Sequence, residues 1–183
     1  SRRKDVVVAT KFGFISHDPP VARASRGYIM EAVEGSLKRL NTDWIDLYQV
    51  HNHDSLVPME ETLHALDDLI RAGKVRHIGC SNHYAWQMVK ALGLSAKLGL
   101  GRYVSQQVLY SLIYRHAEHE LLPAAIDQGV GSLIYSPLAQ GYLTGKFGRA
   151  DGQGRLAASP LWRRAAQLHQ PRRRPPRHAR HRL

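Results

Sequence analysis

The chain has 183 residues, enough for one well-packed core but too few for two ordinary domains. Its 26 basic and 15 acidic residues give a net charge of +11, and its single cysteine, Cys80, excludes an internal disulfide. No apolar run approaches the roughly 18 residues of a membrane span, and the amino end lacks the apolar core of a signal peptide. We therefore expect a cytoplasmic protein that contacts no membrane.

The positive charge is concentrated at the carboxyl end. Residues 154–183 hold nine arginines and no acidic residue, whereas the part before them is almost neutral. From Pro171 onward, Arg, Pro and His dominate, so we expect residues 149–183 to form a disordered basic tail. Arg-rich tails bind polyanions by counterion release. A solvated tail, or an out-of-frame product of a GC-rich gene, is the simpler interpretation, and we expect no nucleic-acid partner.

Apolar runs alternate with amphipathic patterns along the rest of the chain. Apolar residues spaced three and four apart predict helices, and short apolar runs between them predict strands. The expected strands cover residues 6–10, 44–50, 75–80, 103–106 and 130–134. The expected helices cover residues 26–40, 58–72, 83–95 and 117–128. The third has Trp86, Val89 and Leu92 on its apolar face, with Leu94 as a further candidate.

This alternation predicts an α/β fold with a parallel sheet. A closed (β/α)8 barrel needs eight strands and about 250 residues, whereas an open doubly wound sheet tolerates five strands. The doubly wound sheet predicts a Gly-rich phosphate turn, but the chain has neither GxGxxG nor GxxxxGK[ST]. We therefore expect residues 1–148 to form an incomplete (β/α)8 TIM barrel of about five β/α units.

Each expected strand ends on polar residues suited to binding or chemistry. In a parallel barrel the carboxyl ends of all strands open onto one face, which carries the active site. These residues therefore predict a single pocket. They are Lys11, His51, Ser81 with Asn82, Gln107, and Tyr135 with Ser136.

Five segments resemble the aldo/keto reductase family, in the branch of bacterial general oxidoreductases and potassium-channel β subunits. They are Val-Val-Ala-Thr-Lys-Phe-Gly at 7–13, Ser-Leu-Lys-Arg-Leu to Gln-Val-His at 36–51, Gly-Lys-Val-Arg-His-Ile-Gly-Cys-Ser-Asn at 73–82, 107–115, and Tyr-Ser-Pro-Leu-Ala-Gln-Gly at 135–141 continuing to 146. The resemblance implies a barrel that binds NADP(H) and reduces aldehydes or ketones. It places this chain at strands three to seven, a fragment of the family's eight.

The resemblance also implies two catalytic residues. Lys11 matches the lysine that lowers the pKa of the proton-donating tyrosine, and His51 matches the histidine that orients the carbonyl oxygen. The family's Asp-Thr-Ala…Tyr-Gly segment, which supplies the tyrosine and the aspartate that holds the lysine, has no counterpart here. We therefore expect little or no reductase activity from residues 1–183 alone.

The cofactor side is matched more fully. By resemblance, Ser81, Asn82 and Gln107 bind the nicotinamide carboxamide, and Tyr135 stacks on its ring. The loop that reaches the pyrophosphate with its backbone matches Ser136, Pro137, Leu138, Ala139 and Gln140, and Lys146 offers that phosphate a cation. The family's adenosine 2′-phosphate site has no match in residues 149–183, so the choice between NADPH and NADH stays open.

Three functional hypotheses follow: a reductase of small carbonyl compounds, a non-catalytic nucleotide-binding scaffold or regulatory subunit, and a polyanion-binding module acting through the tail. We expect no metal, because the histidines near residues 51–53 and 116–119 lack zinc-site spacing. The sequence leaves the substrate and the oligomeric state open.

Overall fold

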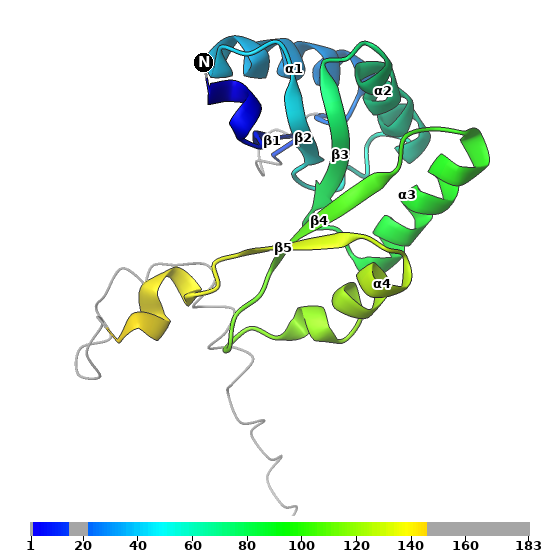
Figure 1. Cartoon of the computed structure of the whole chain (residues 1–183). Helices are drawn as coiled ribbons and strands as arrows, with labels where there is room; N and C mark the ends of the chain where they lie inside the picture. Colours follow the sequence, from blue (N-terminus) through cyan, green and yellow to red (C-terminus); the bar gives the residue numbers. More distant parts are fainter. Residues whose placement is uncertain (1, 15–21, 146–183) are drawn as a thin grey trace, which may run out of the picture.

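The computed structural model describes residues 2–14 and 22–145 (Figure 1), so the expected tail and Lys146 lie outside the described residues. Strands and helices alternate along the chain. The strands are β1 (Ala9–Phe12), β2 (Ile45–Val50), β3 (Val75–Ser81), β4 (Tyr103–Leu109) and β5 (Gly131–Tyr135). The α-helices are α1 (Arg26–Leu40), α2 (Met59–Arg71), α3 (Ala85–Leu98) and α4 (Leu121–Asp127). Three 3₁₀ turns, η1 (Arg2–Asp5), η2 (His116–Glu118) and η3 (Ala139–Thr144), complete the elements.

The five strands form one parallel sheet in the order β1-β2-β3-β4-β5. A doubly wound sheet reverses its direction at a switch point and carries helices on both faces. Here the order never reverses, and helices α1 to α4 follow one another along one face (Figure 1). The expected α/β fold is therefore confirmed, with the winding of a partial (β/α)8 barrel.

A side-chain hydrogen bond shows how strongly the sheet curls. Lys11 Nζ on β1 donates to Gln107 Oε1 on β4 over 3.1 Å, although two strands lie between them. In a flat sheet these strands would be about 14 Å apart, at roughly 4.8 Å per step. The helix-free face is therefore concave, as the inner face of a barrel is.

The core lies between the sheet and the helices. Residues with no exposed surface include Ile29, Val33, Leu63, Leu66 and Ile78. Cys80 is also buried, and burial raises the pKa of its thiol to about 12, so this cysteine stays protonated at neutral pH. Among the described residues no helix is both long and apolar enough to cross a membrane.

The expected apolar face of the third helix was right for Leu92 and wrong for Trp86 and Val89. Trp86 is 59% exposed and Val89 is 40% exposed, whereas Met88 and Leu92 face the core. Leu92 belongs to both stripes at helical spacing, so spacing alone does not choose between them. The stripe that faces the core consists of Ala85, Met88, Ala91, Leu92 and Ser95.

Several element boundaries differ from expectation by one or more residues, and two of these differences are informative. The last helix starts at Leu121 rather than 117, because Pro123 has no N–H to donate and is tolerated only in a first turn. The first strand starts at Ala9, and Val6 and Val7 before it are exposed.

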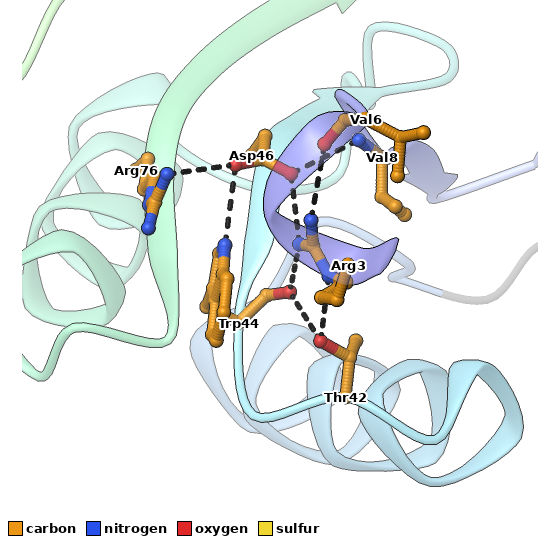
Figure 2. A network of polar contacts seen from close by, with 7 residues as sticks. All are labelled: Arg3, Val6, Val8, Thr42, Trp44, Asp46 and Arg76. Atoms are coloured by element: carbon orange, nitrogen blue, oxygen red, sulfur yellow. Dashed lines mark hydrogen bonds and ion pairs between the residues drawn. The ribbon is translucent and has the colours of Figure 1, made fainter. Parts of the chain in front are cut away.

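A polar cluster ties the first residues to the amino ends of β2 and β3 (Figure 2). Asp46 accepts hydrogen bonds from the Val8 N–H at 3.0 Å and from Trp44 Nε1 at 3.2 Å. It also pairs with Arg3 at 2.7 Å and Arg76 at 3.2 Å. Both guanidinium groups stack on the Trp44 ring, 4.4 and 4.8 Å from its centre. We call these five residues the Asp46 clasp.

Candidate functional site

The polar residues predicted from the strand ends meet on the concave face. His51 directly follows β2, Ser81 ends β3 and Tyr135 ends β5. Lys11 and Gln107 were expected just past their strands, but β1 continues to Phe12 and β4 to Leu109, so both lie inside the sheet. Because alternate strand residues share a face, this places their side chains over the concave interior.

One hydrogen-bonded group joins β1, β2 and β4. Gln107 Oε1 accepts from Lys11 Nζ at 3.1 Å and from Gln49 Nε2 at 3.3 Å. Gln49 is only 1% exposed, whereas Gln107 is half-buried. The lysine therefore contacts an amide in this structure, and its ammonium group lies at the rim of the concave face.

A second group joins β2, β3 and β5. Asn82 Nδ2 donates to the His51 carbonyl at 3.0 Å and to Ser81 Oγ at 3.2 Å. Asn82 Oδ1 accepts from the Tyr135 hydroxyl at 2.8 Å, and Ser81 Oγ donates to the Gln107 carbonyl at 3.0 Å. Together the two groups connect all five strands through their carboxyl-end side chains.

The His51 ring is half-buried and lies against Phe14, with ring centres 5.0 Å apart and the ring planes tilted by 58°. Burial lowers the pKa of His51, and the positive charge of Lys11 lowers it further. The imidazole is therefore neutral at pH 7 and carries one N–H donor. A neutral donor beside a cation suits the binding of a carbonyl oxygen.

Backbone strain concentrates at the same end of the sheet. Among the described residues, five non-glycine residues have positive φ, and four of them are Asn82 (52°), Ser136 (56°), Ala139 (49°) and Gln140 (56°). Such conformations cost about 1–3 kcal/mol each and cluster at ligand sites. In this loop the Ala139 N–H donates to the Ser136 carbonyl at 2.9 Å, with Pro137 and Leu138 forming the turn between them.

Two hollows flank Asn82. One has a volume of about 410 Å³, and its walls include Tyr84, Tyr114, His116 and Tyr135. The other has a volume of about 500 Å³ and is lined partly by Phe14, His53 and Tyr84. In the described part of the chain no cluster of three His, Cys, Asp or Glu residues is arranged to hold a metal.

Sequence reasoning missed two buried residues of this site. Gln49 was hidden within an apolar run, although its position two before His51 put it on the same strand face. His83 follows Asn82 and is 6% exposed, and its Nδ1 lies 2.9 Å from the Ser81 carbonyl. Two sequence signals were available: Gln49 is a polar residue inside an apolar strand, and His83 directly follows a predicted site residue.

The sequence of this chain is similar to those of known proteins. A family model described as "Aldo/keto reductase family" matches residues 1–170. An "Uncharacterized oxidoreductase YrpG" of Bacillus subtilis (strain 168) is 42% identical over 85% of this chain and 49% of its own length. "Aldo-keto reductase YhdN" of the same organism is 42% identical over 80% of this chain and 43% of its own. A "Probable voltage-gated potassium channel subunit beta" of Oryza sativa subsp. japonica is 38% identical over 82% and 46%. The chain thus spans about half the length of these relatives.

Proposed function

This chain belongs to the aldo/keto reductase family, and we propose that it binds NADP(H). We further propose that it forms part of an enzyme that interconverts aldehydes or ketones with alcohols. We assign the binding to residues 1–148 and none of it to the tail at 149–183. The observation that carries the proposal is the convergence of the two hydrogen-bonded groups on one concave rim.

Three side chains are proposed to bind the nicotinamide carboxamide: Ser81, Asn82 and Gln107. They come from two adjacent strands and are linked through the Ser81 hydroxyl. Asn82 is held by three hydrogen bonds, so its amide is oriented before a ligand arrives. Gln107 Nε2 has no hydrogen-bond partner among the described residues, which leaves a donor for the ligand.

The ring and phosphates are assigned to the end of β5. Tyr135 is half-buried, and its hydroxyl is anchored on Asn82, so its aromatic face can support a flat ring. We assign the pyrophosphate to the backbone of Ser136, Pro137, Leu138, Ala139 and Gln140, where positive φ values turn the chain tightly. Lys146 is proposed as the cation for that phosphate and lies outside the described residues.

Two residues are proposed to act on the substrate. Bound NADP(H) supplies or takes up the hydride. The neutral His51 would donate a hydrogen bond to the carbonyl oxygen, and the Lys11 cation would stabilise negative charge developing there. The family's proton-donating tyrosine has no match in residues 1–183, so we propose that this chain alone binds the cofactor with little turnover.

A non-catalytic nucleotide-binding scaffold is the second candidate. It is favoured by the contact of Lys11 with the Gln107 amide, because the described residues place no carboxylate against this lysine. Relatives whose names include a channel β subunit are consistent with such a role. Cofactor binding is common to both candidates, and turnover by the whole protein separates them.

The test is a titration of chain 1–183 with NADPH and, separately, NADH, followed by cofactor fluorescence. We expect saturable binding that Asn82→Ala weakens about tenfold, the value of one to two hydrogen bonds. Asn41→Ala is the matched control, because Asn41 has a similar left-handed φ of 49° but caps α1 outside the site. Absence of saturable binding, or equal losses in the two variants, would overturn the proposal.

A further inference from the structure

Gln49 lies where a strand residue of a core would ordinarily be apolar. It sits near the end of β2 with 1% of its surface exposed, between the buried Tyr48 and Val50. Its side chain shares the concave face with Lys11 and Gln107, its partners across the sheet. Burying an amide is unfavourable unless its hydrogen bonds are kept. The hydrogen bond to Gln107 therefore stabilises the buried Gln49 side chain.

The neighbouring strand leaves room for this amide. At Gly79 on β3, which pairs with Gln49, an added Cβ would lie 3.4 Å from the Gln49 Cγ. The same atom would lie 2.6 Å from Ser105 Oγ and 2.7 Å from the Ser105 carbonyl oxygen. A larger residue at Gly79 would therefore clash with Ser105 on β4, whereas its Cβ would lie at an ordinary van der Waals distance from Gln49.

The direction of both amides follows from donor chemistry. A lysine ammonium has only donors, so the Gln107 atom 3.1 Å from Lys11 Nζ is the oxygen Oε1. The Gln49 atom 3.3 Å from that oxygen must then be the donor Nε2. Lys11 is half-buried at the rim and flexible, whereas Gln49 is enclosed, so Gln49 is the fixed member of the pair.

We propose that Gln49 is a positioning residue that fixes the direction of the Gln107 amide and thereby sets how the site binds the nicotinamide carboxamide. The inference rests on the proposed cofactor binding for its ligand, but the contact between Gln49 and Gln107 is a property of the chain itself. A ligand that differs only in its carboxamide should therefore sense a change at Gln49, without any contact to that residue.

The experiment compares Gln49→Glu and Gln49→Met in chain 1–183. Glutamate keeps the shape but cannot donate from the carboxylate, so it should attract Lys11 and turn the Gln107 amide. Methionine keeps the volume and removes both hydrogen-bonding groups. Each variant is titrated with NADPH and with its 3-acetylpyridine analogue, in which a methyl group replaces the carboxamide NH₂.

Gln106→Met is the matched control. Gln106 is 2% exposed and lies one residue before Gln107, but its Nε2 bonds the Leu121 carbonyl and Ser132 on the helix side. It should lose stability as Gln49→Met does while leaving the affinity ratio of the two ligands unchanged. In Gln49→Glu we expect about tenfold weaker NADPH binding and at least a fivefold change in that ratio. An unchanged ratio in both Gln49 variants would refute the proposal.

Side-chain amide NMR gives a readout that needs no ligand. The Gln107 NH₂ resonances should shift in Gln49→Met and Gln49→Glu, and the Gln49 NH₂ protons should exchange slowly in the unmodified chain. If no cofactor binds but these shifts occur, the proposed function fails and the positioning contact stands. If the Gln107 resonances stay in place, the positioning role is wrong whatever the chain binds.

Discussion

The Tyr135 hydroxyl donates a 2.8 Å hydrogen bond to Asn82 Oδ1, which links the end of β5 to the turn after β3 across the intervening strand β4. This bond orients two proposed cofactor-binding residues at once. Tyr135→Phe keeps the ring but removes the bond, so we expect about fivefold weaker NADPH binding, equivalent to about 1 kcal/mol.

Two further variants make this measurement specific. Tyr135→Ala also removes the aromatic surface and should weaken binding more than Tyr135→Phe does. Tyr28→Phe makes the same hydroxyl deletion on α1, away from the rim, and should bind as the unmodified chain does. Equal affinity of Tyr135→Phe and the unmodified chain would show that the bond has no part in binding.

The charge of Lys11 should be measurable at His51. Because Lys11 contributes to the lowered pKa of His51, Lys11→Met should raise that pKa toward its ordinary value near 6.5. The rise should be partial, since burial is the larger cause. NMR titration of the imidazole C–H resonances measures the shift.

The chain offers a matched control for this titration. Burial is the main cause of the lowered pKa of His53; the charge of Asp54 opposes it, and the charge of Lys90 lowers the pKa further. Lys90→Met should therefore raise the pKa of His53 and leave that of His51 where it was. A His51 pKa that falls or stays constant in Lys11→Met would contradict the proximity of the two groups.

His83 should make folding stability depend on pH. Burial lowers its pKa to about 4, despite the hydrogen bond to the Ser81 carbonyl. Between pH 4 and about 6.5 the unfolded chain binds a proton that the folded chain does not, so stability falls as the pH is lowered through this window. A shift of this size corresponds to roughly 3 kcal/mol over the window.

Urea unfolding at pH 7.5 and pH 4.5 tests this dependence. His83→Phe retains an aromatic ring beside Tyr103 but cannot titrate, so its loss of stability on acidification should be clearly smaller. His77→Gln, at an exposed position on β3, serves as the control and should keep the full pH dependence. An unchanged pH dependence in His83→Phe would mean that other groups cause it.

The Asp46 clasp should contribute measurably to stability. Burial alone would raise the pKa of Asp46, but hydrogen bonds from Val8, Arg3 and Trp44 and the charge of Arg3 lower it overall. Its stabilisation is therefore present at neutral pH and lost as the pH falls through the lowered pKa. We expect Asp46→Asn to reduce the free energy of unfolding by about 2 kcal/mol at pH 7.

Asp5→Asn provides the comparison for the clasp. Asp5 is 62% exposed and pairs with Arg2 at 3.6 Å, a geometry that contributes less than about 0.5 kcal/mol. Guanidinium is unsuitable as the denaturant because its salt screens ion pairs, so both variants are measured in urea. Similar losses in Asp46→Asn and Asp5→Asn would show that the clasp contributes no more than a surface ion pair.

The sequence predicted the fold well because its signals were local. Apolar residues such as Ile29 and Val33 repeat at helical spacing on one stripe, and the helix over 26–40 has the same bounds in the structure. The helix around Trp86 was harder, because two stripes share Leu92 and only contact with the sheet selects one. Pro123 carried a boundary signal that the apolar periodicity of its neighbours concealed.

The site was predictable in its members but not in its connections. The polar residues at strand ends indicated one shared face, since parallel strands end together. No sequence pattern specified that Lys11 reaches Gln107, 96 residues away, because that contact depends on how tightly the sheet curls. For the same reason the role of Gln49 could be inferred only from its hydrogen bond to Gln107, which lies two strands away with β3 between them.

The uninterrupted strand order also bears on how the protein is made. In the described part of the chain each strand after β1 pairs with the strand that precedes it, so none of these pairings waits for a distant segment. Ribosomes release the chain from its amino end, and each new β/α unit can add to a template that has already emerged. Until the next unit arrives, the growing sheet presents an open edge of unpaired amides. A pause in translation between units would therefore prolong exposure of that edge, and chaperone binding during synthesis should peak at these intervals.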